Sequence, residues 1–290
     1  MAVASNVRSA AISPGRQVLT RLWRSGSFMV GFSTLVVLVA LSLAAPALTP
    51  YNPIKINTRE RLQPPGLNHP FGTDQMGRDI LSRVLHGGRL SLPMGVVPVA
   101  IAAVVGMMLG VIAGFYGRWV DLVIMRVADV WIAFPPILMA LAVVTILGTG
   151  LTNIMIALGI AWIPYYTRMA RGTVISAKER VYVEAARALG SQDGRIMLKH
   201  IFPNVLTPIL VMATMGVANA ILAGAALNFL GLGAQAPAPE WGTMLADGRQ
   251  FIRLGWWIGL FPGVTIAVTV LAANLAGDGL RDALDPKLKV

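Results

Sequence analysis

The chain contains long stretches without a single charged residue, and these restrict its fold more than any other feature. Each can hold at least one helix of about 20 apolar residues, the length that crosses the hydrocarbon core of a bilayer. The charge-free gaps run from Arg24 to Lys55, Arg89 to Arg118, Asp129 to Arg168, Lys199 to Glu240 and Arg253 to Asp278. Only 13% of the residues are charged, against about 25% in soluble domains. The sequence therefore predicts an all-α integral membrane protein.

The gap between Asp129 and Arg168 is long enough for two short spans. A turn signal, Leu147-Gly148-Thr149-Gly150, falls near its middle and predicts a tight hairpin. Six transmembrane helices are therefore expected. We place them over 27–48, 90–115, 127–147, 152–171, 205–227 and 256–276.

The distribution of Lys and Arg over the loops predicts the orientation, because cytoplasmic loops carry the excess of positive charge. Six spans place both termini and the loop 174–204 on one side, which has sixteen Lys and Arg residues, while the other side has eight. Both termini are therefore expected in the cytoplasm. The predicted order is a cytoplasmic segment 1–26, a first transmembrane helix 27–48, an extracytoplasmic segment 49–88, a transmembrane domain 89–277 and a cytoplasmic end 278–290.

The N-terminal segment has two interpretations. Residues 15–26 have the pattern of a short amphipathic helix on the inner membrane surface, and a disordered basic tail is the alternative. Basic residues followed by an apolar run and Ala45-Pro46-Ala47 also resemble a secretory signal peptide. The apolar run is longer than the usual stretch of about 7–15 residues, so a retained first helix is favoured.

The sequence does not predict an enzymatic, metal-binding or nucleic-acid-binding site in this chain. A net charge of +11 could suggest nucleic-acid binding, but the basic residues are scattered over short loops. The absence of cysteine excludes thiol nucleophiles and cysteine-ligated zinc, and no Gly-Lys dipeptide is present to form a phosphate-binding loop. The three histidines do not have metal-site spacing, and the span interiors lack the ionisable pairs of an ion-coupled carrier. We therefore expect no catalytic residue, metal or cofactor.

The span interiors carry small residues, prolines and amides instead. Small residues every four positions form flat ridges that let another helix approach closely, either in a second subunit or within the chain itself. The candidates for a subunit interface are Gly106, Gly110, Gly114, Gly216, Ala220 and Gly224. Pro135-Pro136 and Pro164 permit bends. Asn219 and Asn274 are candidates for lining a pathway, although such amides more often bridge helices.

The polar segment 174–204 interrupts this apolar pattern. Good helix formers over 174–189 predict a first helix, and Gly190 supplies the permissive backbone of a helix end. Ser191 is expected to cap a second short helix, and Pro203 to stop it or open the next span. Two helices joined by a glycine turn would form a rigid cytoplasmic knob; an amphipathic connector on the membrane surface is the alternative.

The spacing within this segment is distinctive. Glu184-Ala185-Ala186, three residues, Gly190, nine residues and His200-Ile201-Phe202-Pro203 resemble the EAA loop of ABC importer permeases. His200 and Phe202 stand where the general pattern has Ile and Leu, which is similar to the peptide-permease branch. Residues 69–92, 228–245 and 274–286 also resemble the C-type subunit of dipeptide and oligopeptide permeases.

This resemblance implies a type I ABC importer transmembrane domain in a bacterial inner membrane. It implies a second homologous permease subunit, two cytoplasmic ATPases and an extracytoplasmic binding protein as partners. It also implies that the knob couples to the ATPases through Glu184, Ala185, Ala186, Gly190, His200, Ile201, Phe202 and Pro203. The expected substrates are short peptides, with nickel, glutathione or another small solute as alternatives. A secondary transporter acting alone is the alternative of another class.

The predicted topology can be tested with single cysteines, since the chain has none to remove. In intact cells, a membrane-impermeant thiol reagent should label Gln63→Cys and leave Gln192→Cys unlabelled. The opposite labelling pattern would show that the orientation is inverted.

Overall fold

The computed structural model describes residues 20–284, and within them the chain is helical with no strand; residues 1–19 and 285–290 lie outside the description. Residues 20–24 are helical, Ser25 caps the next helix and Gly26 begins it, while residues 15–19 of the predicted amphipathic segment lie outside the description. The elements are α2 (Gly26–Leu48), η1 (Thr58–Glu60), α3 (Ile80–Tyr116), α4 (Arg118–Ile132), α5 (Pro136–Leu147), α6 (Leu151–Lys178), α7 (Val181–Ala188), α8 (Asp193–Ile196), η2 (Met197–Ile201), α9 (Phe202–Phe229), α10 (Trp241–Arg249) and α11 (Trp257–Leu284).

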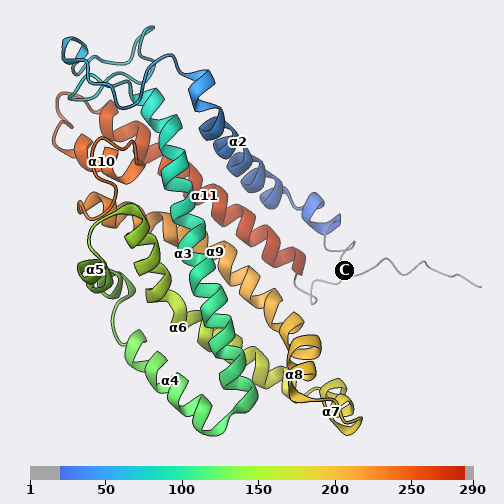
Figure 1. The fold of residues 1–290 in the computed structure, drawn as a ribbon. Helices are drawn as coiled ribbons and strands as arrows, with labels where there is room; N and C mark the ends of the chain where they lie inside the picture. Colours follow the sequence, from blue (N-terminus) through green and yellow to red (C-terminus); the bar gives the residue numbers. More distant parts are fainter. Residues whose placement is uncertain (1–19, 285–290) are drawn as a thin grey trace, which may run out of the picture.

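Four long helical stretches form the body of the molecule (Figure 1). They are α2, α3, the continuous run from α8 to α9, and α11, and each is long and apolar enough to cross a membrane. The pair α4 and α5 qualifies as a fifth crossing if it is taken as one broken span. Helix α6 has 28 residues but is less apolar than the four. Several membrane crossings are thus present, and the count of six stays a prediction.

The predicted third span, 127–147, is not one helix. It divides into the end of α4 and the whole of α5, which are bent by 95° at the break. Pro135 and Pro136 lie at this break, where proline removes backbone donors and restricts the residue before it. The hairpin that follows is confirmed: Gly148 and Gly150 have positive φ angles and separate α5 from α6.

Helix α3 begins ten residues before the predicted span at 90. Asp79 caps it, since its Oδ2 accepts hydrogen bonds from the Ser82 backbone N–H at 2.7 Å and from the Ser82 hydroxyl at 2.7 Å. The helix has 37 residues and is therefore about 55 Å long, whereas the hydrocarbon core is about 30 Å thick. Part of α3 must lie outside the hydrocarbon layer.

Helices α3 and α6 pack closely along a ridge of three glycines. A Cβ atom added at Gly106 would lie 2.7 Å from the Ile163 carbonyl oxygen, and one at Gly110 would lie 2.3 Å from the Thr167 carbonyl oxygen. At Gly114 it would meet the Val174 side chain at 2.8 Å. These glycines therefore serve packing within the chain, the alternative that the sequence left open.

Two ion pairs hold α4 against α6. Arg168 Nη2 lies 2.5 Å from Asp129 Oδ1, and Arg171 forms two hydrogen bonds with Asp121. The acidic residues of α4 are thus paired with the basic residues of α6.

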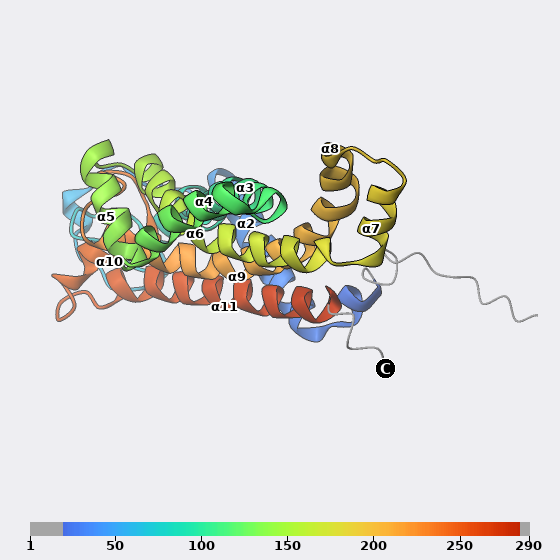
Figure 2. The same cartoon turned by 90° about the horizontal axis from the view of Figure 1, so that it is seen from below.

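The elements gather at two ends of the molecule. Figure 2 shows α7 and α8 beside each other at one end, near the start of α2 and the end of α11. The loop over 49–79 and helix α10 lie at the opposite end (Figures 1 and 2). The described ends of the chain and the knob therefore share one end.

Buried polar groups organise the end that carries α10. Asp74 Oδ2 lies 2.6 Å from Arg78 Nε, and Asp74 Oδ1 accepts the backbone N–H groups of Met76 and Arg78. Arg83 donates to the Pro53 and Pro237 carbonyl oxygens, which connects α3 to both loops. These bonds give a long loop a fixed backbone path.

A second polar contact fastens α10 to α3. Glu240 Oε1 accepts from the Ser91 hydroxyl at 2.9 Å, and the same hydroxyl accepts from the Trp241 backbone N–H at 3.1 Å. Glu240 also caps α10 by accepting from the Thr243 backbone N–H. Because Glu240 is buried and its carboxylate is fully hydrogen-bonded, these bonds hold α10 in one position against α3.

Two acidic residues of this end should respond differently to amide substitution. Asp74→Asn leaves buried Arg78 without its anionic partner and should destabilise the fold by about 3 kcal/mol. Burial raises the pKa of Asp247, so its ionised form gains nothing from folding and Asp247→Asn should change stability by less than about 1 kcal/mol. Thermal unfolding of both variants in detergent, near neutral pH, checks this. Equal losses would contradict it.

Candidate functional site

The knob is formed by α7, α8 and η2, which project from the ends of α6 and α9 (Figure 2). The first predicted helix, 174–189, is interrupted: α6 ends at Lys178, and α7 begins at Val181 after a turn at Glu179 and Arg180. The turn changes the direction of the chain, which leaves the helix bundle at this point.

The glycine turn is confirmed. Gly190 has φ of +77°, and its N–H donates to the Arg187 carbonyl oxygen at 3.0 Å, as expected at a helix C-terminus. The predicted cap by Ser191 is wrong, since α8 starts after Gln192 and has no side-chain cap. Pro203 is the second residue of α9, so it opens that helix.

A small apolar core holds the knob together. Val183 of α7, Ile196 of α8, Ile201 of η2 and Val205 of α9 are fully buried and belong to the same hydrophobic cluster as the α3–α6 contact. The knob is therefore packed against the helix bundle through side chains from four elements.

Polar contacts fix the base of the knob. Lys178 Nζ donates to the carbonyl oxygens of Gly114 at 3.2 Å and Phe115 at 2.7 Å, which lie at the C-terminal end of α3. Asn204 donates to the Tyr182 hydroxyl at 3.2 Å and to the His200 carbonyl oxygen at 2.6 Å. α3 is thus tied to the end of α6 from which the knob projects, and α9 is tied to α7.

The structure gathers the eight predicted coupling residues in this knob but gives them different surroundings. Glu184, Ala185, Gly190 and Pro203 are exposed, whereas Ala186 and Ile201 are buried; His200 and Phe202 are half-buried. Only the exposed members and the edges of the half-buried ones are available to a partner.

Apolar side chains add to the exposed surface of the knob. Val181 is 79% exposed, Leu189 is 87% exposed and Leu198 is 69% exposed. No described part of the chain covers them. The sequence could have indicated these contact residues, since each is an apolar residue in an otherwise polar segment.

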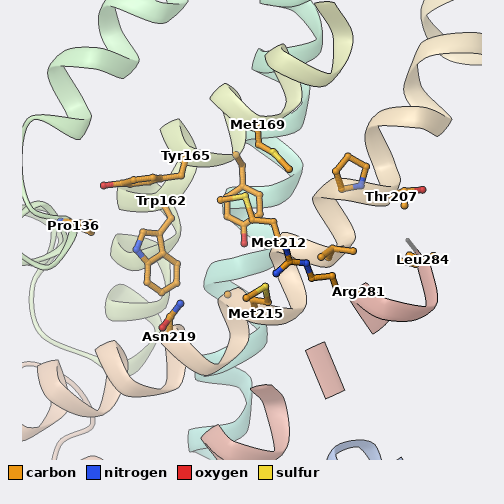
Figure 3. Close-up of a pocket in the computed structure, with 14 residues that line it drawn as sticks. Pro136, Trp162, Tyr165, Met169, Thr207, Met212, Met215, Asn219, Arg281 and Leu284 are labelled. Atoms are coloured by element: carbon orange, nitrogen blue, oxygen red, sulfur yellow. The ribbon is translucent and has the colours of Figure 1, made fainter. Parts of the chain in front are cut away.

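A large cavity opens beside α6 and α9 (Figure 3). Its volume is about 730 Å³, within the usual range of ligand-binding pockets. It is lined by Pro136 of α5; Trp162, Tyr165, Tyr166 and Met169 of α6; Thr207, Pro208, Val211, Met212, Met215, Gly216 and Asn219 of α9; and Arg281 and Leu284 of α11.

The cavity includes two of the predicted interface and pathway residues, and also Pro136 of the proline pair. Asn219 and Gly216 line it, whereas Asn274 lies exposed on α11 away from it. Ala220 and Gly224 are buried, and a Cβ at Gly224 would lie 2.2 Å from Met94 Cγ, so this part of the second ridge packs within the chain.

The aromatic and methionine lining of the cavity was not predicted from the sequence. The pattern that could have indicated it is the helical spacing of four residues on one face of α6: Trp162, Tyr165, Tyr166 and Met169. Such a stripe is usual for core packing, and only the spatial arrangement shows that these side chains border open space. Among the described residues, no group of three histidine or acidic side chains is arranged to hold a metal ion.

Comparison with known proteins agrees with this architecture. A family model described as binding-protein-dependent transport system inner membrane component matches residues 106–290, and one for the N-terminal TM domain of oligopeptide transport permease C matches residues 13–65. The dipeptide transport system permease protein DppC of Alkalihalophilus pseudofirmus is 49% identical over 279 residues, covering 96% of this chain and 92% of that protein. The glutathione transport system permease protein GsiD of Pectobacterium atrosepticum is 42% identical over 278 residues, with the same two coverages of 96% and 92%.

A solved structure shares the fold. A chain of the MetNI methionine ABC transporter in an inward-facing conformation matches with a TM-score of 0.55 at 20% identity, covering 71% of this chain and 98% of that chain. The helical architecture is therefore that of a type I ABC importer transmembrane domain. The chain belongs to the family of binding-protein-dependent transport system inner membrane components.

Proposed function

We propose that this chain is the permease subunit of an ATP-driven importer and, with a second, homologous permease subunit, forms the membrane pathway for short peptides. ATP hydrolysis is supplied by two cytoplasmic ATPase subunits, and an extracytoplasmic binding protein delivers the substrate. The observation that carries the proposal is the knob, whose exposed surface is joined rigidly to the helices that border the cavity.

The knob is suited to transmit movement because it is connected to both walls of the cavity. Helix α6 runs from the nearest lining residue of the cavity, Met169, to the base of the knob at Lys178, about 14 Å along the helix axis. Helix α9 runs back from the knob at Phe202 to the nearest lining residue of the cavity, Thr207, about 8 Å. A displacement of the knob therefore moves the two helices that carry most of the lining.

The exposed surface of the knob fits a noncovalent contact with an ATPase subunit. Exposed Leu189 and Val181 supply apolar area, and Glu184 supplies a carboxylate that can pair with a cation or accept from backbone N–H groups. Closure of the ATPases on ATP would then favour one packing of the two permease subunits through differential contact with the knob.

The proposal fixes the orientation of the molecule. The knob, the start of α2 and the end of α11 are placed in the cytoplasm, and the loop 49–79 with α10 is placed outside the inner membrane of a bacterium. The excess of Lys and Arg at the knob end supports this assignment. The subunit itself is proposed to be non-catalytic, because its sequence has no Gly-Lys phosphate-binding motif.

Short peptides are the substrates best supported, since the relative named for dipeptides is 49% identical over nearly the whole chain. The relative named for glutathione transport favours glutathione as a second candidate. Nickel or another small solute remains an alternative substrate of the same kind of importer, and a secondary transporter is the alternative of another class.

Disruption of the exposed part of the knob should abolish uptake. Glu184→Lys reverses a surface charge, and Gly190→Trp places a bulky side chain at a φ of +77°, where L-residues are strained by about 1–2 kcal/mol. Both variants should remain in the membrane in normal amount and lose ATP-dependent uptake.

Matched controls separate coupling from general damage. Asp278→Lys makes a charge reversal at an exposed position of α11 outside the knob and the cavity lining, and Gly26→Trp adds the same bulk at an open position on α2. Uptake by these controls should stay near the wild-type rate. Normal uptake by Glu184→Lys and Gly190→Trp would exclude the knob as the coupling element.

The substrate is tested by uptake in a strain deleted for this gene. Labelled dipeptides and tripeptides should accumulate only when the gene is restored and ATP is available. Nickel and glutathione uptake are measured in parallel in both strains. If peptide uptake is unchanged by deletion while nickel or glutathione uptake is lost, the substrate assignment is overturned and the importer assignment stands.

A further inference from the structure

The cavity between α6, α9 and α11 contains one charged side chain. Most of its lining is aromatic, methionine or aliphatic, and the neutral polar groups are Thr207, Asn219 and the tyrosine hydroxyls. Arg281 is the single ionisable residue of Asp, Glu, Lys or Arg type among the lining residues. Figure 3 shows its guanidinium directed toward Met212 and Met215 of α9.

Arg281 has no protein partner within the described part of the chain. No ion pair or hydrogen bond of its side chain occurs among residues 20–284. By contrast, Arg168 and Arg171 on the neighbouring α6 are both paired with carboxylates of α4. A guanidinium beside apolar side chains offers several N–H donors for an oxygen anion.

The dimensions of the cavity fit an extended short peptide. From Thr207 to Asn219 the α9 wall rises about 18 Å, and an extended chain advances about 3.3–3.6 Å per residue. Arg281 and Leu284 stand at the end of α11 that lies toward the knob. Methionine side chains adapt to varied shapes, so this wall suits different peptide side chains, whereas every free peptide shares one terminal carboxylate.

We infer that Arg281 is a specificity-determining residue of the cavity, which receives the terminal carboxylate of a transported peptide at the mouth nearest the knob. This inference rests on the proposed function. The guanidinium donates N–H groups to the carboxylate, and the apolar walls contact the remaining chain. Because Arg281 is exposed to the cavity, the contact is partly screened by water and weak enough to allow release.

Charge complementarity favours a peptide over a purely structural role. A cation in the last turn of α11 is favoured by the helix dipole wherever its side chain points. The dipole does not explain why the guanidinium lies over the α9 methionines inside the cavity. A carboxylate from the second permease subunit is the competing occupant, and the experiment below distinguishes the two.

The absence of cysteine allows a direct test in the complete transporter. Met212→Cys places one thiol of this chain in the cavity, and its alkylation is followed by the mass of this subunit. Dialanine and dialanine amide are titrated as protecting ligands, so that only the terminal charge differs. With Arg281 present, the free acid should give half-protection at a concentration roughly five- to tenfold lower than the amide, the scale of one screened charge-assisted hydrogen bond.

Substitution of Arg281 should remove the difference between the two ligands. Arg281→Gln should make acid and amide equally protective, and Arg281→Lys should retain part of the preference for the acid. Arg126→Gln is the matched control, since it removes an exposed α4 cation that does not line the cavity; it should leave the preference unchanged.

Different results would contradict the role of Arg281 and the proposed function of peptide import. Equal protection by acid and amide with Arg281 present, no protection by either, or a preference that survives Arg281→Gln would overturn the role of Arg281. Uptake of dialanine by the unsubstituted transporter is measured alongside. Intact uptake with any of those outcomes overturns this inference alone, whereas loss of peptide uptake in the unsubstituted transporter overturns the proposed function as well.

Discussion

The close contact between α3 and α6 is the interaction on which the other parts of the structure depend. Three glycines on α3 leave room for backbone atoms of α6, so that the two helices run side by side along the body of the molecule. Helix α6 also carries the cation partners of α4, the aromatic wall of the cavity and the entrance to the knob. Wider separation of α3 and α6 would displace all three together.

The same arrangement places two kinds of surface on one pair of helices. α6 and α9 are apolar and aromatic where they border the cavity, and they are continued by polar segments where they meet the knob. Lys178 closes this unit by binding carbonyl oxygens at the end of α3. The proposed transmission from an ATPase to the pathway therefore needs only the displacement of packed helices, without any unfolding of the chain.

The sequence was sufficient for features that depend on local composition, including the apolar stretches, the Gly148–Gly150 hairpin and the turn at Gly190. It was insufficient where distant groups satisfy a polar residue. Arg89 suggests a loop by its charge, yet it lies inside α3 because the Ser42 and Leu43 carbonyl oxygens accept its N–H groups. The proline pair signalled a weak point in the third predicted span, but its 95° angle depends on packing of α4 and α5 against other helices. The cavity could not be predicted either, because its lining comes from four helices that are distant in the sequence.

The winding of η2 makes the two attachments of the knob mechanically unequal. At α6 the chain is interrupted, whereas at α9 the helical path continues through the five residues of a π-helix. A π turn holds one more residue than an α turn, so conversion between the two windings changes the phase of the preceding helix by about 100° while the helix stays continuous. If η2 changed to α winding, the knob would turn about the α9 axis, and the break between α6 and α7 is the place where the chain could take up that turn.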